Sequence, residues 1–246
     1  MRSRIVSKYV LHTPRVRRPY RIAVAADLHN KDFTDILAVC ADADLLLIPG
    51  DLIHRYPRKA ERGLAFLRAA AQRLPTYYTY GNHEDECDDA FEARVRESGA
   101  VLLNNACCRQ EELAIGGILL FDRPRLLHRH DRRNIGDGLA GAAEGTLEQL
   151  EAEAGFRLLL SHKPDHFIPH VGARDIDLTV SGHAHGGQIC LWGRGLYAPN
   201  QGMLPAYTRG LYCENRLLVT TGASNVSPIP RVRNPCEVVL LEISPR

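Results

Sequence analysis

Five apolar runs in this sequence each end in a short polar block, and this pattern constrains the fold more than any other feature. The runs cover residues 20–26, 44–49, 76–80, 157–160 and 177–180. Short runs of aliphatic and aromatic side chains of this kind predict buried β-strands. Residues 33–41 and 59–73 have helical patterns, so strand and helix alternate in the first part of the chain. The sequence therefore predicts an α/β fold.

The polar blocks contain residue types that bind metal ions. They are Asp27-Leu28-His29, Gly50-Asp51, Gly81-Asn82-His83-Glu84, Ser161-His162 and Ser181-Gly182-His183-Ala184-His185. In an open α/β sheet, the loops at the carboxyl ends of the strands converge on one crevice, where ligands bind. Residues more than a hundred positions apart can therefore line a single site.

Imidazole and carboxylate groups together suit Zn, Fe or Mn better than Ca or Mg. The ligands expected for one ion are Asp27, His29 and His185. Those expected for a second ion are Asn82, His162 and His183. Asp51 would bridge the two ions, and seven protein ligands fit two ions better than one. The ligand types accept Mn, Fe and Zn alike, as divalent or trivalent ions, so they do not choose among these metals.

Two metal ions about 3.5–4 Å apart can stabilise both the attacking and the leaving oxygen of a phosphoryl group during in-line displacement. A hydroxide that bridges the ions would be the nucleophile, because metal coordination lowers the pKa of water towards neutrality. His83 would face the leaving oxygen as a general acid or hydrogen-bond donor, and Glu84 would orient the His83 imidazole. The blocks therefore predict a phosphoester hydrolase.

The order of the blocks, D-x-H, G-D-x-x, G-N-H-E, a lone H and G-H-x-H, resembles that of the calcineurin-like metallophosphoesterase superfamily over roughly residues 20–190. The resemblance implies the metallo-dependent phosphatase fold, a four-layer α/β/β/α sandwich of two mixed sheets flanked by helices. It places a dinuclear metal site at one edge of the paired sheets. The family's ligand positions agree with those inferred above.

Further motifs resemble the YkuE/YaeI-like phosphodiesterase subgroup. They lie at residues 186–189, 198–202, 207–212 and 222–235. This resemblance implies a small phosphodiester or pyrophosphate as substrate. Phosphomonoesterase activity and a UDP-2,3-diacylglucosamine-type lipid pyrophosphatase are the alternatives. A metal-binding protein-interaction scaffold is the non-enzymatic alternative, although every expected ligand type is present.

Several polar residues are candidates for binding the substrate. They are His54, Arg123, Asn200, Tyr207, Arg209 and Asn225, with Arg231 beside them. His54 stands where the superfamily pattern often has an aspartate, and it could contact substrate or lie in a surface loop. Arg123 begins a basic loop that could attract an anion or be a solvated segment. The remaining candidates follow Gln188 in a loop rich in Gly, Pro and Tyr, which they could instead pack.

The length of 246 residues and the 45% hydrophobic content suit a single domain over residues 1–246. Residues 146–154 have a helical pattern, and residues 188–192, 217–221 and 237–243 are expected to be strands of the second sheet. A net charge of +2 does not argue for a nucleic-acid or membrane partner, and we expect no nucleic acid. Basic residues near the amino terminus could touch anionic lipid, but their apolar face is poor. The oligomeric state is not predicted.

The seven cysteines are odd in number and lack C-x-x-C spacing. This argues against a disulfide framework and favours a reducing compartment. The sequence contains no run of about 18 apolar residues and no apolar core of a signal peptide. We therefore expect a cytoplasmic protein.

Overall fold

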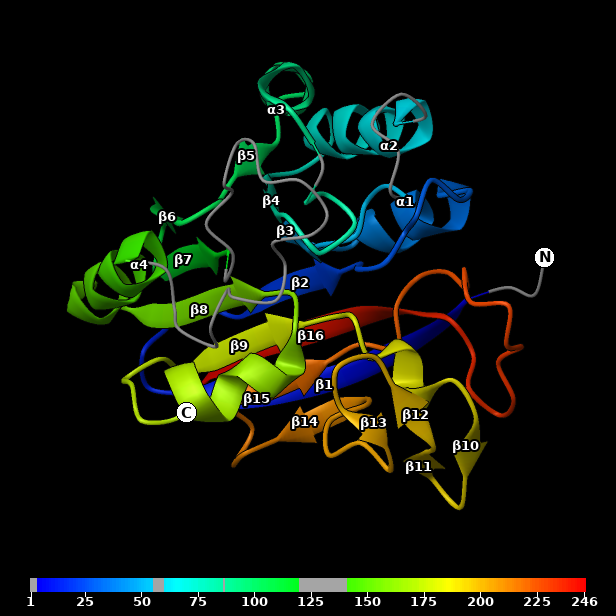
Figure 1. The fold of residues 1–246 in the computed structure, drawn as a ribbon. Coiled ribbons are helices and arrows are strands. Elements are labelled where there is room, and N and C mark those ends of the chain that lie inside the picture. The colour runs from blue at the N-terminus through cyan, green and yellow to red at the C-terminus, as the bar shows by residue number, and fades with distance from the viewer. Residues whose placement is uncertain (1–3, 55–59, 86, 120–140) are drawn as a thin grey trace.

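Two six-stranded sheets pack face to face, and helices cover the outer face of each sheet (Figure 1). The computed structural model describes residues 4–54, 60–85, 87–119 and 141–246. The layers follow the order helix, sheet, sheet, helix, which confirms the expected four-layer α/β/β/α sandwich. Both sheets contain parallel and antiparallel neighbours, so both are mixed as expected.

The first sheet contains three of the five predicted strands. Its strand order is β1 (Ile5–Thr13), β16 (Glu237–Pro245), β2 (Tyr20–Val24), β3 (Leu45–Pro49), β4 (Thr76–Thr79) and β5 (Val101–Leu102). The helices on its outer face are α1 (Thr34–Cys40), α2 (Glu61–Ala71) and α3 (Asp89–Glu97). The predicted helices at residues 33–41 and 59–73 are confirmed as α1 and α2.

The second sheet contains the other two predicted strands. Its strand order is β14 (Gly210–Tyr212), β15 (Leu217–Val219), β9 (Leu178–Ser181), β8 (Phe156–Ser161), β7 (Leu113–Ile118) and β6 (Ala106–Gln110). Its outer face packs against α4 (Gly141–Ala152) and the π-helical turn η3 (Phe167–Val171), which follows the 3₁₀ turn η2 (Pro164–His166). The helix expected at residues 146–154 is the second half of α4.

Side chains of the central strands alternate between two cores. In β2, Ile22 and Val24 face the second sheet, whereas Ala23 faces the helices. In β8, Leu158 and Leu160 lie between the sheets, and the side chain between them packs on the α4 side. Because both faces of these strands are buried, their sequences read as continuous apolar runs.

The expectation that residues 188–192, 217–221 and 237–243 build the second sheet is wrong for two of the three segments. β15 lies in that sheet, but β16 lies between β1 and β2 in the first sheet. β10 (Cys190–Leu191) pairs with β11 (Arg194–Gly195) in a separate hairpin. An apolar run predicts that a strand is buried, but it does not specify the strand with which it pairs.

A second small hairpin follows, formed by β12 (Tyr197–Ala198) and β13 (Gly202–Met203). Both hairpins lie beside the sandwich after the 3₁₀ turn η4 (His185–Gly187), in the yellow part of Figure 1. Within the described part of the chain, no helix is long and apolar enough to cross a membrane.

Candidate metal centre

The five polar blocks meet at one edge of the sandwich, although their strands belong to two different sheets. The backbone amide of His183, after β9, lies 3.2 Å from both carboxylate oxygens of Asp27, which follows β2. His162 Nε2, after β8, lies 3.3 Å from Asp51 Oδ2, which follows β3. These contacts join the second sheet to the first at the ends of the strands, and they create one shared site.

The first group of candidate ligands is Asp27, His29 and His185, whose ligand atoms all lie within 4.8 Å of one another. Nε2 of His185 lies 3.7 Å from Asp27 Oδ1, and Nε2 of His29 lies 3.9 Å from the same oxygen. His29 Nδ1 lies 3.2 Å from the carbonyl oxygen of Ile53. If Nδ1–H donates to this carbonyl, Nε2 keeps its lone pair for a metal ion.

The second group contains Asn82, His162 and His183. His162 Nε2 lies 3.1 Å from Asn82 Oδ1 and 3.2 Å from His183 Nδ1. The other nitrogen of each imidazole faces a fixed acceptor, because His162 Nδ1 lies 2.8 Å from the Pro49 carbonyl and His183 Nε2 lies 3.1 Å from Asn200 Oδ1. These acceptors favour the tautomers that point a lone pair at the common centre.

Asp51 lies between the two groups. Its Oδ2 atom is 3.7 Å from His29 Nε2 on one side and 3.3 Å from His162 Nε2 on the other. This is the position expected for a carboxylate that bridges two ions. Among the described residues, the buried His29 Nε2 has no hydrogen-bond partner. Coordination of a cation by its lone pair would satisfy this buried nitrogen. The residues present therefore fit a pair of metal ions.

Five of the candidate ligands have left-handed backbone conformations. The φ angles are 55° at Asp27, 49° at His29, 55° at Asp51, 64° at His183 and 46° at His185. Such conformations are uncommon for residues other than glycine and concentrate at functional sites, where surrounding structure holds them. They turn the chain sharply after each strand, so that the side chains of successive loops point to the same centre.

Two glycines allow the loops to approach so closely. Gly50 has a φ of +89°, and a Cβ atom there would lie 2.5 Å from His162 Nδ1. Gly222 has a φ of +80°, and a Cβ atom there would lie 2.8 Å from the Asp27 side chain. A larger residue at either position would displace a candidate ligand.

Burial and charge set the protonation of the imidazoles. Burial lowers the pKa of His29 and His185, and it lowers the pKa of His183 to about 3, so these rings are neutral and can bind metal. Burial also acts against the charged form of His162, but the Asp51 carboxylate outweighs it and raises the pKa of His162 to about 9. A proton on His162 therefore occupies the place where a cation would neutralise Asp51.

The sequence profile of the calcineurin-like phosphoesterases matches residues 20–187, which contain every candidate ligand described above. The chain belongs to the calcineurin-like phosphoesterase family. This confirms the resemblance at the level of the superfamily. The assignment to the YkuE/YaeI-like subgroup stays a prediction.

Similar proteins include an uncharacterised metallophosphoesterase of Campylobacter jejuni, 26% identical, which aligns over 94% of this chain and 60% of its own length. An uncharacterised metallophosphoesterase of Helicobacter pylori is 24% identical over 96% of this chain and 63% of its own length. The chain thus spans about 60% of the length of these relatives. Among solved structures, the sulfate thiohydrolase SoxB of Thermus thermophilus aligns with a TM-score of 0.48 and 12% identity, covering 82% of this chain and 51% of that one.

Glu84 stabilises the backbone of the candidate metal site. Its buried carboxylate accepts hydrogen bonds from the amides of Gly81 at 2.7 Å, Asp51 at 3.0 Å and Ile53 at 3.0 Å. Glu84 therefore fixes the loop that carries the Asp51 carboxylate. The expected role, orientation of the His83 imidazole, stays a prediction.

A loop near the carboxyl terminus, residues 222–235, contacts the first group of candidate ligands. Ser224 Oγ donates to the Asp27 carbonyl at 2.8 Å, and Arg231 Nη2 donates to the Ser224 carbonyl at 2.6 Å. The same Arg231 nitrogen lies 2.9 Å from His185 Nδ1. Arg231 was a candidate for binding the substrate, and these contacts place it against His185, a candidate metal ligand. Ser224 lies in the motif at residues 222–235 but was not among the predicted site residues.

A cavity of about 240 Å³ opens over the metal centre. Its lining residues are Asp51, Asn82, His83, Lys163, His183, His185, Pro199 and Asn200. His83 and Asn200 were predicted to act on the substrate, and both line this cavity. Lys163 was missed by the sequence analysis. Its position directly after His162 was the only available signal, and the structure buries its side chain at the cavity wall.

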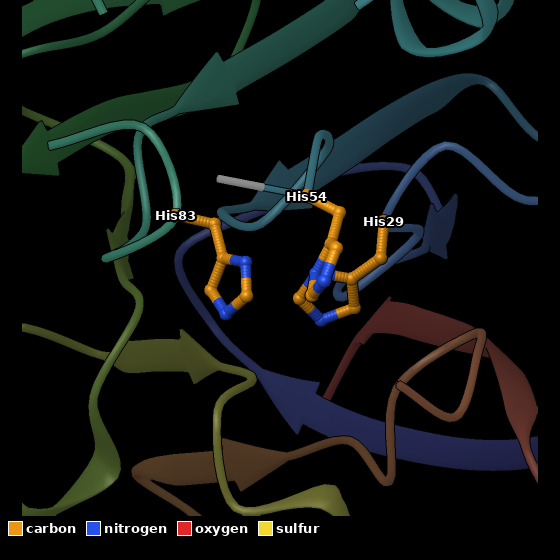
Figure 2. A group of neighbouring side chains, drawn as sticks. All are labelled: His29, His54 and His83. Atoms are coloured by element: carbon orange, nitrogen blue, oxygen red, sulfur yellow. The ribbon is translucent and has the colours of Figure 1, made fainter. Parts of the chain in front are cut away.

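His54 lies close to two of the residues already described. Its ring centroid is 5.7 Å from that of His29 and 5.0 Å from that of His83. Figure 2 shows the three imidazoles projecting in the same direction from three different loops. Their candidate ligand nitrogens all lie within 4.8 Å of one another. The structure therefore brings His54 to the side of the metal centre where His83 stands.

The other candidates for substrate binding have different surroundings. The Tyr207 ring packs edge-on against Tyr212 with centroids 5.2 Å apart, and Asn225 Oδ1 accepts from Gln188 Nε2 at 2.9 Å. The Arg209 amide lies 3.2 Å from the Tyr212 hydroxyl. These contacts support the alternative that the residues pack their own loop. Arg123 and the basic loop that it begins lie outside the described residues.

Proposed function

We propose that this phosphoesterase hydrolyses a phosphodiester or pyrophosphate bond with the help of two metal ions. The observation that carries the proposal is the position of Asp51 between two groups of candidate ligands, because a carboxylate there can contact an ion in each group. The preference for a diester over a monoester rests on the resemblance to the YkuE/YaeI-like subgroup.

When bound, two such ions would lower the pKa of water to provide a nucleophile near neutral pH, and would offset negative charge on the phosphoryl oxygens. Mn, Fe and Zn all suit the mixture of imidazole, carboxylate and amide ligands. The protein's own residues would hold the phosphoryl group over Asp51, in the cavity bounded by Asn82 and His183. In an in-line displacement the leaving oxygen would depart opposite the attacking nucleophile.

We assign His83 the role of donor to that leaving oxygen. Its ring lines the cavity, and its Nε2 atom lies 3.8 Å from Asp51 Oδ2. Its backbone amide donates to Asp51 Oδ1 at 2.9 Å, which fixes the residue relative to the bridging carboxylate. His83 would donate a proton or a hydrogen bond to the departing oxygen. His54, on the same side, would contact the leaving group.

The cysteines support a proposal about location. All seven are free thiols in the structure, and burial raises the pKa of Cys40 to about 12, well away from reactive values. Free thiols fit a reducing compartment, and we therefore assign the protein to the cytoplasm as part of this proposal.

The proposal is tested with purified protein, bound metal measured by mass spectrometry, and parallel assays on bis-p-nitrophenyl phosphate, p-nitrophenyl phosphate and a nucleoside diphosphate sugar with Mn²⁺ added. We expect two metal ions per chain and faster turnover of the diester or the pyrophosphate than of the monoester. Protein that holds two ions but hydrolyses none of the three would favour a scaffold. Faster monoester turnover would overturn the diester preference.

A further inference from the structure

Exposed apolar side chains gather in one small part of the molecule. Eleven large hydrophobic residues are exposed among those described, and six of them lie between residues 192 and 232. These six are Trp192, Tyr197, Met203, Leu204, Ile229 and Val232. Trp192 is 94% exposed, and Met203 and Leu204 are 69% and 70% exposed. A concentration of this kind marks an interaction surface more often than scattered single residues do.

Backbone hydrogen bonds join the segments that carry these side chains. The amide of Leu204 donates to the Leu196 carbonyl at 2.8 Å, and the amide of Leu196 donates to the Ile189 carbonyl at 2.8 Å. The amide of Cys190 donates to the Val232 carbonyl at 2.9 Å. The two hairpins and residues 229–233 thus form one unit beside the sandwich, here called the hairpin module (Figure 1).

The module presents its apolar groups at protruding positions. Trp192 and Gly193 form the turn between β10 and β11, with φ angles of 48° and 81°. Two consecutive positive φ angles give a tight hairpin turn, so Trp192 is held at a tip rather than on a loose loop. In the second hairpin Tyr197 pairs with Met203, and residues opposite each other across an antiparallel pair share one face.

The charge around the module is one-sided. Residues 186–236 contain five arginines, at positions 194, 209, 216, 231 and 233, and a single acidic residue, Glu214. Arg194, Arg209 and Arg233 are exposed. The whole chain has a net charge of only +2, so positive charge is concentrated here. Apolar tips surrounded by arginine suit an anionic bilayer surface, into which tryptophan inserts at the level of the headgroups.

We propose that the hairpin module docks on a bilayer surface that contains anionic phospholipids. A second copy of this chain fits less well, because a symmetric contact would bring like arginines together. The second hairpin also forms part of the cavity, since Pro199 and Asn200 lie in the turn between β12 and β13. Docking through Tyr197 and Met203 would therefore bring the cavity close to the headgroup layer. The proposal is independent of the proposed function, because binding is measured without hydrolysis.

The chain contains a single tryptophan, so the fluorescence of Trp192 reports on the module alone. We expect vesicles of phosphatidylcholine and phosphatidylglycerol in equal amounts to shift its emission to shorter wavelength, and brominated acyl chains to quench it. Vesicles of phosphatidylcholine alone should give a much smaller shift, and high salt should weaken binding to the anionic vesicles. No shift with anionic vesicles, or an equal shift with neutral ones, would overturn the proposal.

Two variants separate docking from folding and catalysis. The double variant Met203→Ser, Leu204→Ser should bind anionic vesicles at least about tenfold more weakly, because its apolar area is reduced. Its thermal unfolding temperature and its turnover of a soluble diester should be unchanged. Ile168→Ser is the matched control, since Ile168 is 58% exposed but lies in η3, outside the module. An equal loss of vesicle affinity in the double variant and in Ile168→Ser would contradict the assignment. So would a parent protein that does not bind vesicles but forms a dimer that the double variant disrupts.

Discussion

The metal centre and the hairpin module lie side by side but differ in burial and in charge. The centre buries Asp27, Asp51 and Glu84 among imidazoles, with each polar atom facing a ligand group or a backbone partner. The module exposes Trp192 and Met203 among arginines. A buried cluster of carboxylates and imidazoles is suited to binding cations, whereas an exposed apolar and basic surface is suited to docking on an anionic partner.

Asn200 belongs to both regions, because it lies in the turn of the second hairpin and contacts His183. Under the two proposals, chemistry and membrane docking belong to separate parts of the molecule that meet at Asn200. Substitutions in the metal centre should therefore alter metal content or turnover. Substitutions at the cavity wall next to the hairpin module should alter substrate binding instead. The following substitutions test that division.

The largest effect is expected from Asp51→Asn. The amide keeps the size of the side chain but removes the negative charge that faces both ligand groups. Several kcal/mol of charge stabilisation would be lost, and each 1.4 kcal/mol or so corresponds to about a tenfold change in rate. We expect turnover to fall by about 10³-fold or more and bound metal to fall with it. Two ions retained in Asp51→Asn would show that Asp51 does not bridge them.

His83→Asn should reduce turnover while most of the metal remains. General acid catalysis contributes about 10²–10⁴-fold, and the expected loss lies in that range. Metal analysis and turnover should be measured on the same preparation, with His166→Asn as a control outside the candidate ligand set. A better leaving group than p-nitrophenol should narrow the difference between His83→Asn and the parent protein. If His83→Asn empties both metal positions, His83 is a ligand.

Glu84→Gln separates two roles for this residue. The glutamine amide group would face at least one of the three backbone amides that Glu84 accepts from, and an unsatisfied buried group costs about 1–3 kcal/mol. For a protein of this size, each kcal/mol lowers Tm by roughly 2–4 °C. A lower Tm with an unchanged pH dependence of turnover supports the backbone role. An unchanged Tm with a shift in the acidic limb of the pH profile of turnover would support orientation of the His83 imidazole instead.

The convergence of the candidate ligands could be predicted from the sequence because the relevant signals are local. Asp27, Asp51 and His162 each follow an apolar run that ends at a strand terminus, and the carboxyl ends of parallel strands share an edge. The residue type and the position therefore both pointed to the site. The helices between the first three strands were predictable for the same reason.

The parts that escaped prediction depend on long-range packing. β16 reads like any buried strand, and only its pairing with Ile5–Thr13 and Tyr20–Val24 places it in the first sheet. Lys163 looks like an ordinary charged residue in the sequence, and burial alone distinguishes it. The left-handed backbone of His183 is likewise a product of the surrounding loops. Such features carry no sequence pattern of their own.

The smallest effect is expected from Lys163→Met, which tests the boundary between the two regions. Lys163 is buried at the cavity wall, where its charge lies near the carboxylates of Asp165, Asp85 and Asp51. A hydrogen bond to a charged group contributes about 1.5–3 kcal/mol, and the nearby carboxylates should reduce its effect on an anionic substrate.

We therefore expect KM for bis-p-nitrophenyl phosphate to rise by about tenfold with kcat little changed, as for a contact made equally in the ground and transition states. Lys163→Arg should restore most of the affinity, and both variants should keep their metal and bind anionic vesicles like the parent. If Lys163→Met lowers kcat and leaves KM unchanged, Lys163 acts in the chemical step and belongs with the metal centre.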